Sequence, residues 1–367
     1  MKHEEYMQLA IELAAKGAGH VSPNPLVGAV IVKDGEVIGQ GYHEKYGGLH
    51  AEKAALENCH KNPMDSTMYV TLEPCSHFGK QPPCALAIIE AGIKTVYIGS
   101  DDPNPKVSGK GMAMLKEAGI KIIPHFLKSR CDELNEIFFH YIKTKKPYIS
   151  LKYAMSLDGK IATYTGNSQW ITGSLARAHV HKMRNDYTAI MVGSETVLSD
   201  NPMLNCRLPE GGVNPIRIVC DSRLRIPMDS NLVKTANSIS TIIATCSDHM
   251  KKISELQDAG CQVLRLASHD EHIDLRQLID KLGKMSIDSI LVEGGGTLNW
   301  ALMEVGLVNH IKCYMGSKIL GGSLSKSPIA GLGFTNVDNG PHVEIKNVER
   351  FQNDILIEAD IFHERSL

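Results

Sequence analysis

Three side chains in the first quarter of the chain have the types and the order of a metal-binding set. His50 begins the triplet His50-Ala51-Glu52, and Cys75 and Cys84 follow it. An imidazole and two thiolates are ligands that Zn²⁺ prefers, and three protein ligands leave the fourth tetrahedral position for water. Zinc lowers the pKa of such a water to about 7, which makes hydroxide available near neutral pH. The sequence therefore predicts one Zn²⁺ held by His50, Cys75 and Cys84.

Glu52 lies two residues from a ligand, so its carboxylate can reach the water without binding the metal. H-x-E followed by P-C-x-x-C is the signature of zinc-dependent base deaminases, in which this glutamate carries a proton from the water to the leaving amine. Here Cys75 and Cys84 enclose eight residues instead of two, and the longer loop carries His77 and Lys80. Such a loop suits an anionic substrate, so we predict a deaminase with Glu52 as its catalytic residue.

Two other interpretations of this motif are less favoured. A lone histidine or cysteine is more often a packing or surface residue than a ligand, but the ordered set favours a metal. A purely structural zinc is closed by four protein ligands, whereas three ligands beside Glu52 leave an open position. Catalysis is therefore favoured over a structural role.

Composition bounds the class of protein. The chain has 367 residues, which is long for one domain and sufficient for two. A net charge of −2 and an aromatic content of 5% give neither the charge nor the stacking groups typical of nucleic-acid binding. No apolar run approaches the roughly 20 residues that span a bilayer. The nine cysteines are an odd number with no signal peptide ahead of them, so we expect reduced thiols in the cytoplasm and no membrane contact.

The elements around the zinc motif alternate between strand and helix. Apolar periodicity and turn residues predict helices at residues 4–16, 51–59, 85–91 and 111–118, and strands at 26–32, 37–41, 67–72, 94–99 and 121–124. This order predicts a mixed α/β/α sandwich, with two helix starts next to the metal ligands. A helix at 131–143 and the basic, proline-ended stretch at 143–147 place a domain boundary between residues 145 and 146.

The second half continues the alternation, and its strand at residues 290–292 ends in a glycine-rich turn. Glu293-Gly294-Gly295-Gly296-Thr297-Leu298 leads from that strand into a helix through Met303. Three glycines let backbone N–H groups approach a pyrophosphate at a helix N-terminus. The alternative is a plain turn, and the motif is not the G-x-G-x-x-G of a Rossmann domain. Further strands are expected at residues 148–154, 188–193, 216–220, 241–244, 263–266, 312–315 and 355–362, and helices from 174 to about 184 and at 275–282.

Both halves resemble one family. His50-Ala51-Glu52, the stretch from Glu73 to Lys80, Pro82-Pro83-Cys84 and Asp102-Pro103-Asn104-Pro105, together with the second-half phrase LKYAMSLDGKIA at residues 151–162, are similar to the bifunctional riboflavin-biosynthesis deaminase/reductases. The resemblance covers essentially the whole chain. It implies an α/β fold with a cytidine-deaminase-like α/β/α sandwich with mixed sheet in residues 1–145, the zinc-dependent pyrimidine deaminase domain. A dihydrofolate-reductase-like α/β domain in residues 146–367 would be the NADPH-dependent reductase.

The resemblance also implies the reactions. The first domain would deaminate 2,5-diamino-6-ribosylamino-4(3H)-pyrimidinone 5′-phosphate hydrolytically. The second would reduce the ribosyl side chain, as its ring-opened imine, by hydride transfer from NADPH, giving 5-amino-6-(5-phosphoribitylamino)uracil. The partner is thus a phosphorylated pyrimidine, and a homo-oligomer is expected. The alternative is a nucleic-acid base deaminase with a C-terminal binding module, which the near-neutral charge and the long intercysteine loop disfavour.

Site residues carried over from the resemblance form three sets. The deaminase substrate pocket comprises Asn24, His43, His77, Lys80 and Asn104. The NADPH contacts are Ala154, Trp170, Thr196, Asp200, Ser222, Gly294, Gly295, Gly296, Thr297 and Leu298. The reductase substrate contacts are Lys152, Ser168, Arg184, Leu204, Arg207 and Glu293.

Charge chemistry supports several of these roles. Arg184 and Arg207 are expected to bind phosphate, since a guanidinium can bind two oxygens at once, although a surface ion pair is the commoner role of an arginine. Lys152, Asp200 and Glu293 are the ionisable residues expected to supply or position a proton. Asn205 and Ser317 depart from the family pattern, which usually has threonine and proline there, and they affect only local loop geometry.

Overall fold

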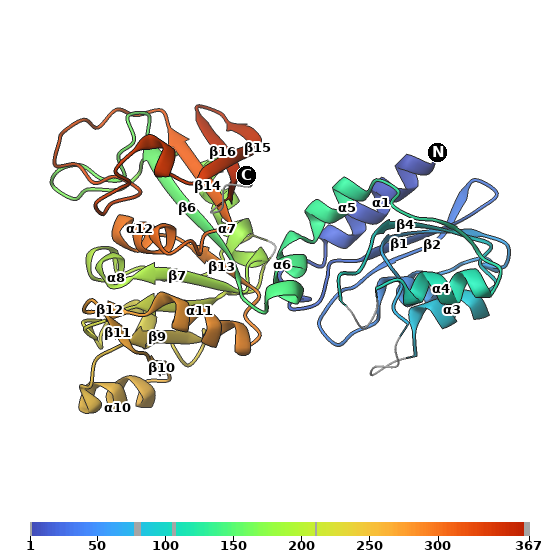
Figure 1. Ribbon diagram of the computed structural model, residues 1–367, viewed down its shortest axis with the longest axis horizontal. Helices are drawn as coiled ribbons and strands as arrows, with labels where there is room; N and C mark the ends of the chain where they lie inside the picture. Colours follow the sequence, from blue (N-terminus) through green and yellow to red (C-terminus); the bar gives the residue numbers. More distant parts are fainter. Residues whose placement is uncertain (1, 77–81, 105–107, 210, 363–367) are drawn as a thin grey trace. The chain divides into compact units, whose positions relative to one another are not determined.

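The computed structural model describes residues 2–76, 82–104, 108–209 and 211–362. The chain folds as two compact units, Met1–Lys145 and Lys146–Leu367. Each unit is built around its own sheet (Figure 1). In the described residues, no helix is both long enough and apolar enough to cross a membrane.

The N-terminal unit has a five-stranded sheet in the order β2-β1-β3-β4-β5. β1 is antiparallel to both of its neighbours, β2 and β3, whereas β3, β4 and β5 run parallel to one another. The bounds of the strands are β1 Gly28–Lys33, β2 Glu36–Tyr42, β3 Thr67–Leu72, β4 Thr95–Ser100 and β5 Lys121–Ile123. The sheet is therefore mixed, as the sequence predicted.

Helices cover both faces of this sheet (Figure 1). On one face, Met7 and Ala10 of α1 pack against Val30 and Tyr69, with α5 beside them. On the other face, α2, α3 and α4 bury small and branched side chains against β1, β3 and β4. The bounds of the helices are α1 His3–Ala15, α2 Ala51–Glu57, α3 Cys84–Glu90, α4 Lys110–Glu117, α5 Lys128–Leu134 and α6 Glu136–Thr144. The α/β/α sandwich is thus confirmed.

The single helix expected at residues 131–143 is wrong, because Asn135 separates α5 from α6. Asn135 has non-helical angles, φ −119° and ψ 21°, and is only 2% exposed. Its amide forms two hydrogen bonds with the backbone of Leu26: Oδ1 accepts from the N–H at 2.8 Å, and Nδ2 donates to the C=O at 2.9 Å. These buried contacts, 109 residues apart in sequence, outweigh local helix propensity.

The C-terminal unit has a nine-stranded sheet in the order β10-β9-β8-β7-β13-β6-β14-β16-β15. The strands from β10 to β14 in this order are parallel, and the last two are antiparallel. Their bounds are β6 Tyr148–Ser156, β7 Ala189–Gly193, β8 Ile216–Cys220, β9 Thr241–Thr245, β10 Gln262–Arg265, β13 Ser289–Val292, β14 His310–Gly316, β15 His342–Phe351 and β16 Asp354–Phe362. A separate two-stranded sheet pairs β11 Ser268–His269 with β12 His272–Ile273.

Helices also cover both faces of the large sheet. On one side, α11 and α12 bury Leu278 and Leu302 against Ile149 and Met191. On the other side, α8, α9 and α10 contribute Val197, Leu232 and Ile253 to a second core with Val219. The bounds are α7 Ser174–Asp186, α8 Ser194–Asp200, α9 Asn231–Lys234, α10 Met250–Asp258, α11 Leu275–Lys284, α12 Gly296–Glu304 and the 3₁₀ helix η1 Val337–Asn339.

Candidate active sites

His50, Cys75 and Cys84 come together although three different elements carry them. His50 is the N-cap of α2, Cys84 is the first residue of α3, and Cys75 lies in the loop after β3. The Nδ1 atom of His50 is 3.6 Å from Sγ of Cys75 and 3.3 Å from Sγ of Cys84. All three ligand atoms lie within 4.8 Å of one another, and the described residues contain no other such cluster. One nitrogen and two sulfur atoms converging in this way fit a tetrahedral zinc ion.

The electrostatics of this cluster favour a thiolate. Hydrogen bonds with Cys84 and His50 lower the pKa of Cys75, and the N–H of Cys84 donates to the same sulfur at 3.3 Å. The pKa of His50 is raised, mainly by its hydrogen bond with Cys75. The pKa of Cys84 is raised by its hydrogen bond with Cys75 and by burial. Metals bind the thiolate form of cysteine, so this charge distribution suits a metal ligand set.

Glu52 lies in the first turn of α2 and is only 4% exposed. Burial and the nearby charge of Cys75 raise the pKa of its carboxyl to about 6. A side-chain hydrogen bond links it to Cys84. A carboxyl group near this pKa can accept and release a proton close to neutral pH, which is what a general acid and base requires.

Asn24 and His43 form a short chain of contacts that leads to His50. Nδ1 of His43 lies 2.8 Å from the carbonyl oxygen of Leu49, which can only accept, so the proton is on Nδ1. Nε2 of the neutral ring then accepts from Nδ2 of Asn24 at 3.1 Å. The rings of His43 and His50 lie edge to face, with centroids 5.6 Å apart. This arrangement fixes the orientation of the Asn24 amide, because Nδ2 is the atom bound to His43.

Glu73 was not assigned a role from the sequence, but its buried carboxylate organises the loops near Cys75. It accepts hydrogen bonds from the N–H groups of Gly109 and Gly111, both at 3.0 Å. Gly111 packs against Pro74, because a Cβ at this position would lie 1.9 Å from the Pro74 oxygen. Asn104 lies on the loop after β4, where its N–H donates to Asp102 at 2.8 Å. His77 and Lys80, the other expected substrate contacts, lie outside the described residues.

In the second unit, Glu293 lies just beyond the end of β13 between two basic side chains. Arg184 donates to its carboxylate through Nε at 2.6 Å and through a terminal nitrogen at 2.9 Å. Nζ of Lys152 lies 3.6 Å from Oε2, and all three side chains are less than 15% exposed. Burial alone would raise the pKa of Glu293, but Arg184 and Lys152 lower it to about 2. Burial lowers the pKa of Lys152.

This ion pair differs from the role expected for Arg184. The sequence predicted a phosphate ligand, but two of its N–H groups bind Glu293 and a third donates to the Asn205 oxygen at 3.1 Å. Because Asn205 follows Leu204, this hydrogen bond holds the backbone next to Leu204 close to the Arg184 side chain. Arg207 is exposed, and it donates to Asn205 Oδ1 at 2.5 Å.

The glycine turn joins the ends of two neighbouring strands. Gly294 has a φ of +112°, a conformation that favours glycine, and its oxygen accepts from the N–H of Gly193 at the end of β7 at 3.0 Å. Gly295 is the N-cap of α12, and a Cβ there would meet only Oγ1 of Thr196, at 3.6 Å. Gly296 instead packs against the backbone of Ser327. The turn therefore presents one open backbone face at a helix N-terminus, beside Thr196.

The remaining expected contacts lie along the same sheet. Ala154 is two residues beyond Lys152 on β6, so both point to the same face. Ser222 follows the end of β8, and its hydroxyl accepts from the Ile273 N–H at 3.1 Å.

Asp200 ends α8 and is exposed, and Thr297 is exposed whereas Leu298 is buried. Ser168 and Trp170 lie in the loop before α7, and the ring of Trp170 lies 4.5 Å from the Arg177 guanidinium. Ligands of open α/β sheets bind outside the carboxyl ends of such strands.

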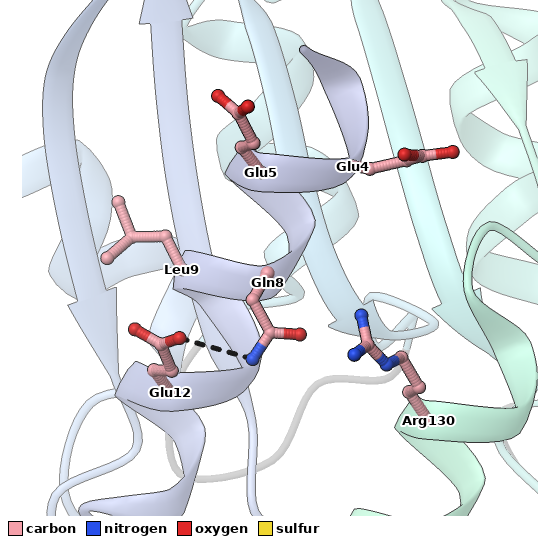
Figure 2. A pocket seen from close by; sticks show the side chains of 6 residues that line it. All are labelled: Glu4, Glu5, Gln8, Leu9, Glu12 and Arg130. Atoms are coloured by element: carbon pink, nitrogen blue, oxygen red, sulfur yellow. Dashed lines mark hydrogen bonds between the residues drawn. The ribbon is translucent and has the colours of Figure 1, made fainter. Parts of the chain in front are cut away.

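A surface hollow of about 380 Å³ lies between α1 and α5 (Figure 2). Half of its lining residues are acidic; the lining comprises Glu4, Glu5, Gln8, Leu9, Glu12 and Arg130. Gln8 donates to Glu12 at 3.2 Å, which is a bond within one helix. None of the expected site residues lines this hollow.

Two family models match the chain, one in each unit. Residues 1–100 match the cytidine and deoxycytidylate deaminase zinc-binding region, and residues 147–357 match the RibD C-terminal domain. The riboflavin biosynthesis protein RibD of Actinobacillus pleuropneumoniae is 51% identical over 354 residues, which cover 96% of this chain and 94% of that protein. RibD of Bacillus amyloliquefaciens is 40% identical over 97% of this chain and 95% of its own length.

Solved structures agree with these matches. A diaminohydroxyphosphoribosylaminopyrimidine deaminase/5-amino-6-(5-phosphoribosylamino)uracil reductase from Thermotoga maritima is 38% identical, with a TM-score of 0.85 and 98% of both chains covered. RibD of Acinetobacter baumannii is 34% identical, with a TM-score of 0.86 over 98% of both chains. Similarity thus extends over both units.

Proposed function

The chain belongs to the RibD family of bifunctional riboflavin-biosynthesis deaminase/reductases, and from this premise we propose how its own residues divide the two reactions. It is an enzyme with both activities, a zinc-binding deaminase domain and a reductase domain. We assign residues 1–145 to hydrolytic deamination of the phosphorylated diaminopyrimidine and residues 146–367 to reduction of its ribosyl side chain. A nucleic-acid deaminase with a binding module is not favoured, because the similarity continues through the reductase half.

In the deaminase unit, His50, Cys75 and Cys84 would hold one Zn²⁺, and Glu52 would move the proton. Bound zinc supplies a Lewis acid that lowers the pKa of water. The Glu52 carboxyl would accept a proton and deliver it to the leaving amine, since it is buried next to the three ligands without belonging to them. Oδ1 of Asn24, held by His43, orients an amino group of the pyrimidine. His77, Lys80 and Asn104 complete the pocket, with Lys80 binding the phosphate.

In the reductase unit, the open face of the glycine turn would bind the pyrophosphate of NADPH, which supplies the hydride. The N-terminus of α12 and the neighbouring Thr196 favour an anion at this position. Ala154, Trp170, Asp200, Ser222, Thr297 and Leu298 extend the cofactor site. The ion-paired core of Lys152, Arg184 and Glu293 orients the substrate with Ser168 and Leu204, and the exposed Arg207 binds its phosphate.

We also propose a homo-oligomer in the cytoplasm. β15 forms an edge of the large sheet and leaves three apolar side chains exposed: Val343, Ile345 and Val348. An exposed apolar edge strand favours pairing with another chain. All nine cysteines are free, which fits a reducing compartment.

The observation that carries the proposed division of function is the position of Glu52, buried beside a three-ligand cluster without belonging to it. Glu52→Gln should keep zinc and lose deamination, while reduction of substrate that has already been deaminated continues. Metal analysis and an absorbance assay of NADPH consumption test this. Loss of zinc, or equal loss of both activities, would contradict the assignment.

A further inference from the structure

Residues 168–173 carry Ser168 and Trp170 without forming a helix or a strand. The Trp170 side chain is 58% exposed, so burial of its ring does not hold the segment in place. A loop that must present two binding side chains needs other constraints, because ordering each backbone residue costs about 1–2 kcal/mol. The constraints are found far along the chain.

Three residues beyond residue 310 contact this segment. Nζ of Lys318 donates to the carbonyl oxygen of Trp170 at 2.6 Å. Oδ2 of Asp354 accepts from the N–H of Gly173 at 2.6 Å. Gly316 lies against Ile171, since a Cβ at this position would be 2.3 Å from the Ile171 oxygen. The segment is therefore held at three points, by the end of β14, by Lys318 just beyond it and by the start of β16.

Asp354 is the best placed of the three. It begins β16, is only 5% exposed, and accepts from the N–H of Gly173, the N-cap residue of α7, which has no side chain of its own to form a cap. A Cβ on Gly173 would lie 3.2 Å from the same carboxylate oxygen, so the close contact depends on the glycine. The negative charge is also favourable at a helix N-terminus.

The helix that begins after Gly173 carries two arginines, of which one contacts Trp170 and the other is an expected substrate contact. Arg177, one turn into α7, stacks on the Trp170 ring and donates to the Thr172 oxygen at 2.6 Å. Arg184, at the other end of α7, binds Glu293. Fixing the start of α7 therefore fixes the Trp170 segment and the helix that presents both guanidinium groups.

We propose that Asp354 and Lys318 are positioning residues for the reductase, holding residues 168–173 in the conformation that binds NADPH and substrate. The inference rests on the proposed function, since it takes Trp170 as a cofactor contact and Ser168 as a substrate contact. Neither Asp354 nor Lys318 would touch the reacting atoms.

Fluorescence offers a direct test, because the chain has two tryptophans, Trp170 and Trp300. In a Trp300→Phe background, Trp170 is the sole emitter and reports both its own environment and the binding of NADPH. Asp354→Ala should shift the Trp170 emission and raise the Kd for NADPH about tenfold, the effect of losing one charge-assisted hydrogen bond. Asp354→Asn keeps an acceptor oxygen and should restore most of the affinity.

Two further variants separate positioning from stability. Lys318 is exposed, so Lys318→Met should fold, and it should raise the Kd about threefold by removing one hydrogen bond to a carbonyl. Asp274 caps α11 by accepting from the Gln277 N–H at 3.0 Å. Asp274→Ala is the matched control: it removes an aspartate cap elsewhere in the same unit and should lower stability without changing the Kd.

Trp170→Ala, followed by the fluorescence of NADPH itself, separates the cofactor contact from the positioning of the segment. An unchanged Kd in this variant would remove Trp170 from the cofactor site and refute the proposed contact. A raised Kd in Trp170→Ala with normal binding in folded Lys318→Met and Asp354→Ala would overturn the positioning inference alone. An equal rise in the Kd for NADPH in Asp274→Ala and in Asp354→Ala would also overturn the positioning inference. If Asp354→Ala does not fold, the Kd of Lys318→Met for NADPH tests the positioning inference in its place.

Discussion

Glu293→Gln tests the charged core of the reductase unit. The substitution keeps the shape of the side chain but removes the charge that faces Arg184 and Lys152. The glutamate side chain is 7% exposed, so water cannot replace the lost carboxylate. Breaking a buried ion pair by removing one partner typically costs about 3–5 kcal/mol, because the remaining charge is left uncompensated.

The pKa of Glu293 gives a second route to the magnitude. A pKa of about 2 in the folded protein, against 4.5 for an ordinary glutamate, corresponds to about 3 kcal/mol of stability at neutral pH. Because the folded-state pKa is lowered, this contribution is fully present above pH 4.5 and is lost as the pH falls through 2. The difference in the free energy of unfolding between the wild type and Glu293→Gln should therefore stay constant from pH 7 to about 5 and become smaller below 4.5.

Urea unfolding followed by tryptophan fluorescence measures this effect in the C-terminal unit alone, since Trp170 and Trp300 both lie in it. Glu271→Gln is the matched control, because Glu271 pairs with Arg223 at 2.9 Å but is 81% exposed. Exposed pairs contribute little, so this control should unfold almost as the wild type does. Equal stability of Glu293→Gln and the wild type at pH 7, or a difference that grows as the pH falls, would refute the reasoning.

Three further outcomes are expected. Gly295→Val should weaken NADPH binding at least about tenfold without affecting deamination, since its side chain would enter the open face beside Thr196; an unchanged Kd in a titration of folded protein would remove the turn from the cofactor site. Asn135→Leu should destabilise the N-terminal unit by about 2–4 kcal/mol in urea unfolding, because it leaves the Leu26 N–H and C=O unpaired; a loss confined to the other unit would count against it. In Glu293→Gln, the alkaline limb of the pH–rate profile of the reductase should move to lower pH, because Glu293 raises the pKa of Lys152 in the wild type. A profile that does not move would exclude Lys152 as the titrating group.

Sequence patterns predicted most strands and the convergence of His50, Cys75 and Cys84, because both depend on local order. The strand at Thr67–Leu72 matches its expected bounds, and the apolar run before Glu293 is a buried strand. The histidine and the two cysteines converge, although the cysteines are farther apart in sequence than in the usual signature, because His50 and Cys84 lie at the starts of α2 and α3. The glycine turn was also identified, although three consecutive glycines do not reveal that the positive φ falls at Gly294.

Features that depend on distant contacts were missed. β15 was not expected, since its pairing with β16 shifts by one residue between Ile345 and Asn347 and breaks the alternation that marks a strand. Nothing in the local sequence distinguishes Arg184 as the partner of Glu293, 109 residues away, from a free phosphate ligand. Asp354 contacts Gly173 across 181 residues, and a single aspartate at the start of a strand carries no signal of that role.

If the proposed function holds, the charges of Lys152, Arg184 and Glu293 restrict which residue can supply the proton in reduction. Glu293, with a pKa of about 2 beside two cations, holds no proton at neutral pH and acts as an anchor for Arg184 and Lys152. Asp200 is exposed at the end of α8, where it accepts from the Ser199 hydroxyl at 2.8 Å. Under the proposed function, Lys152 is the group among the three that would carry the proton, since it lies next to Glu293 and burial lowers its pKa below that of an ordinary lysine. The same glutamate that keeps Lys152 charged thereby limits how readily that proton is released.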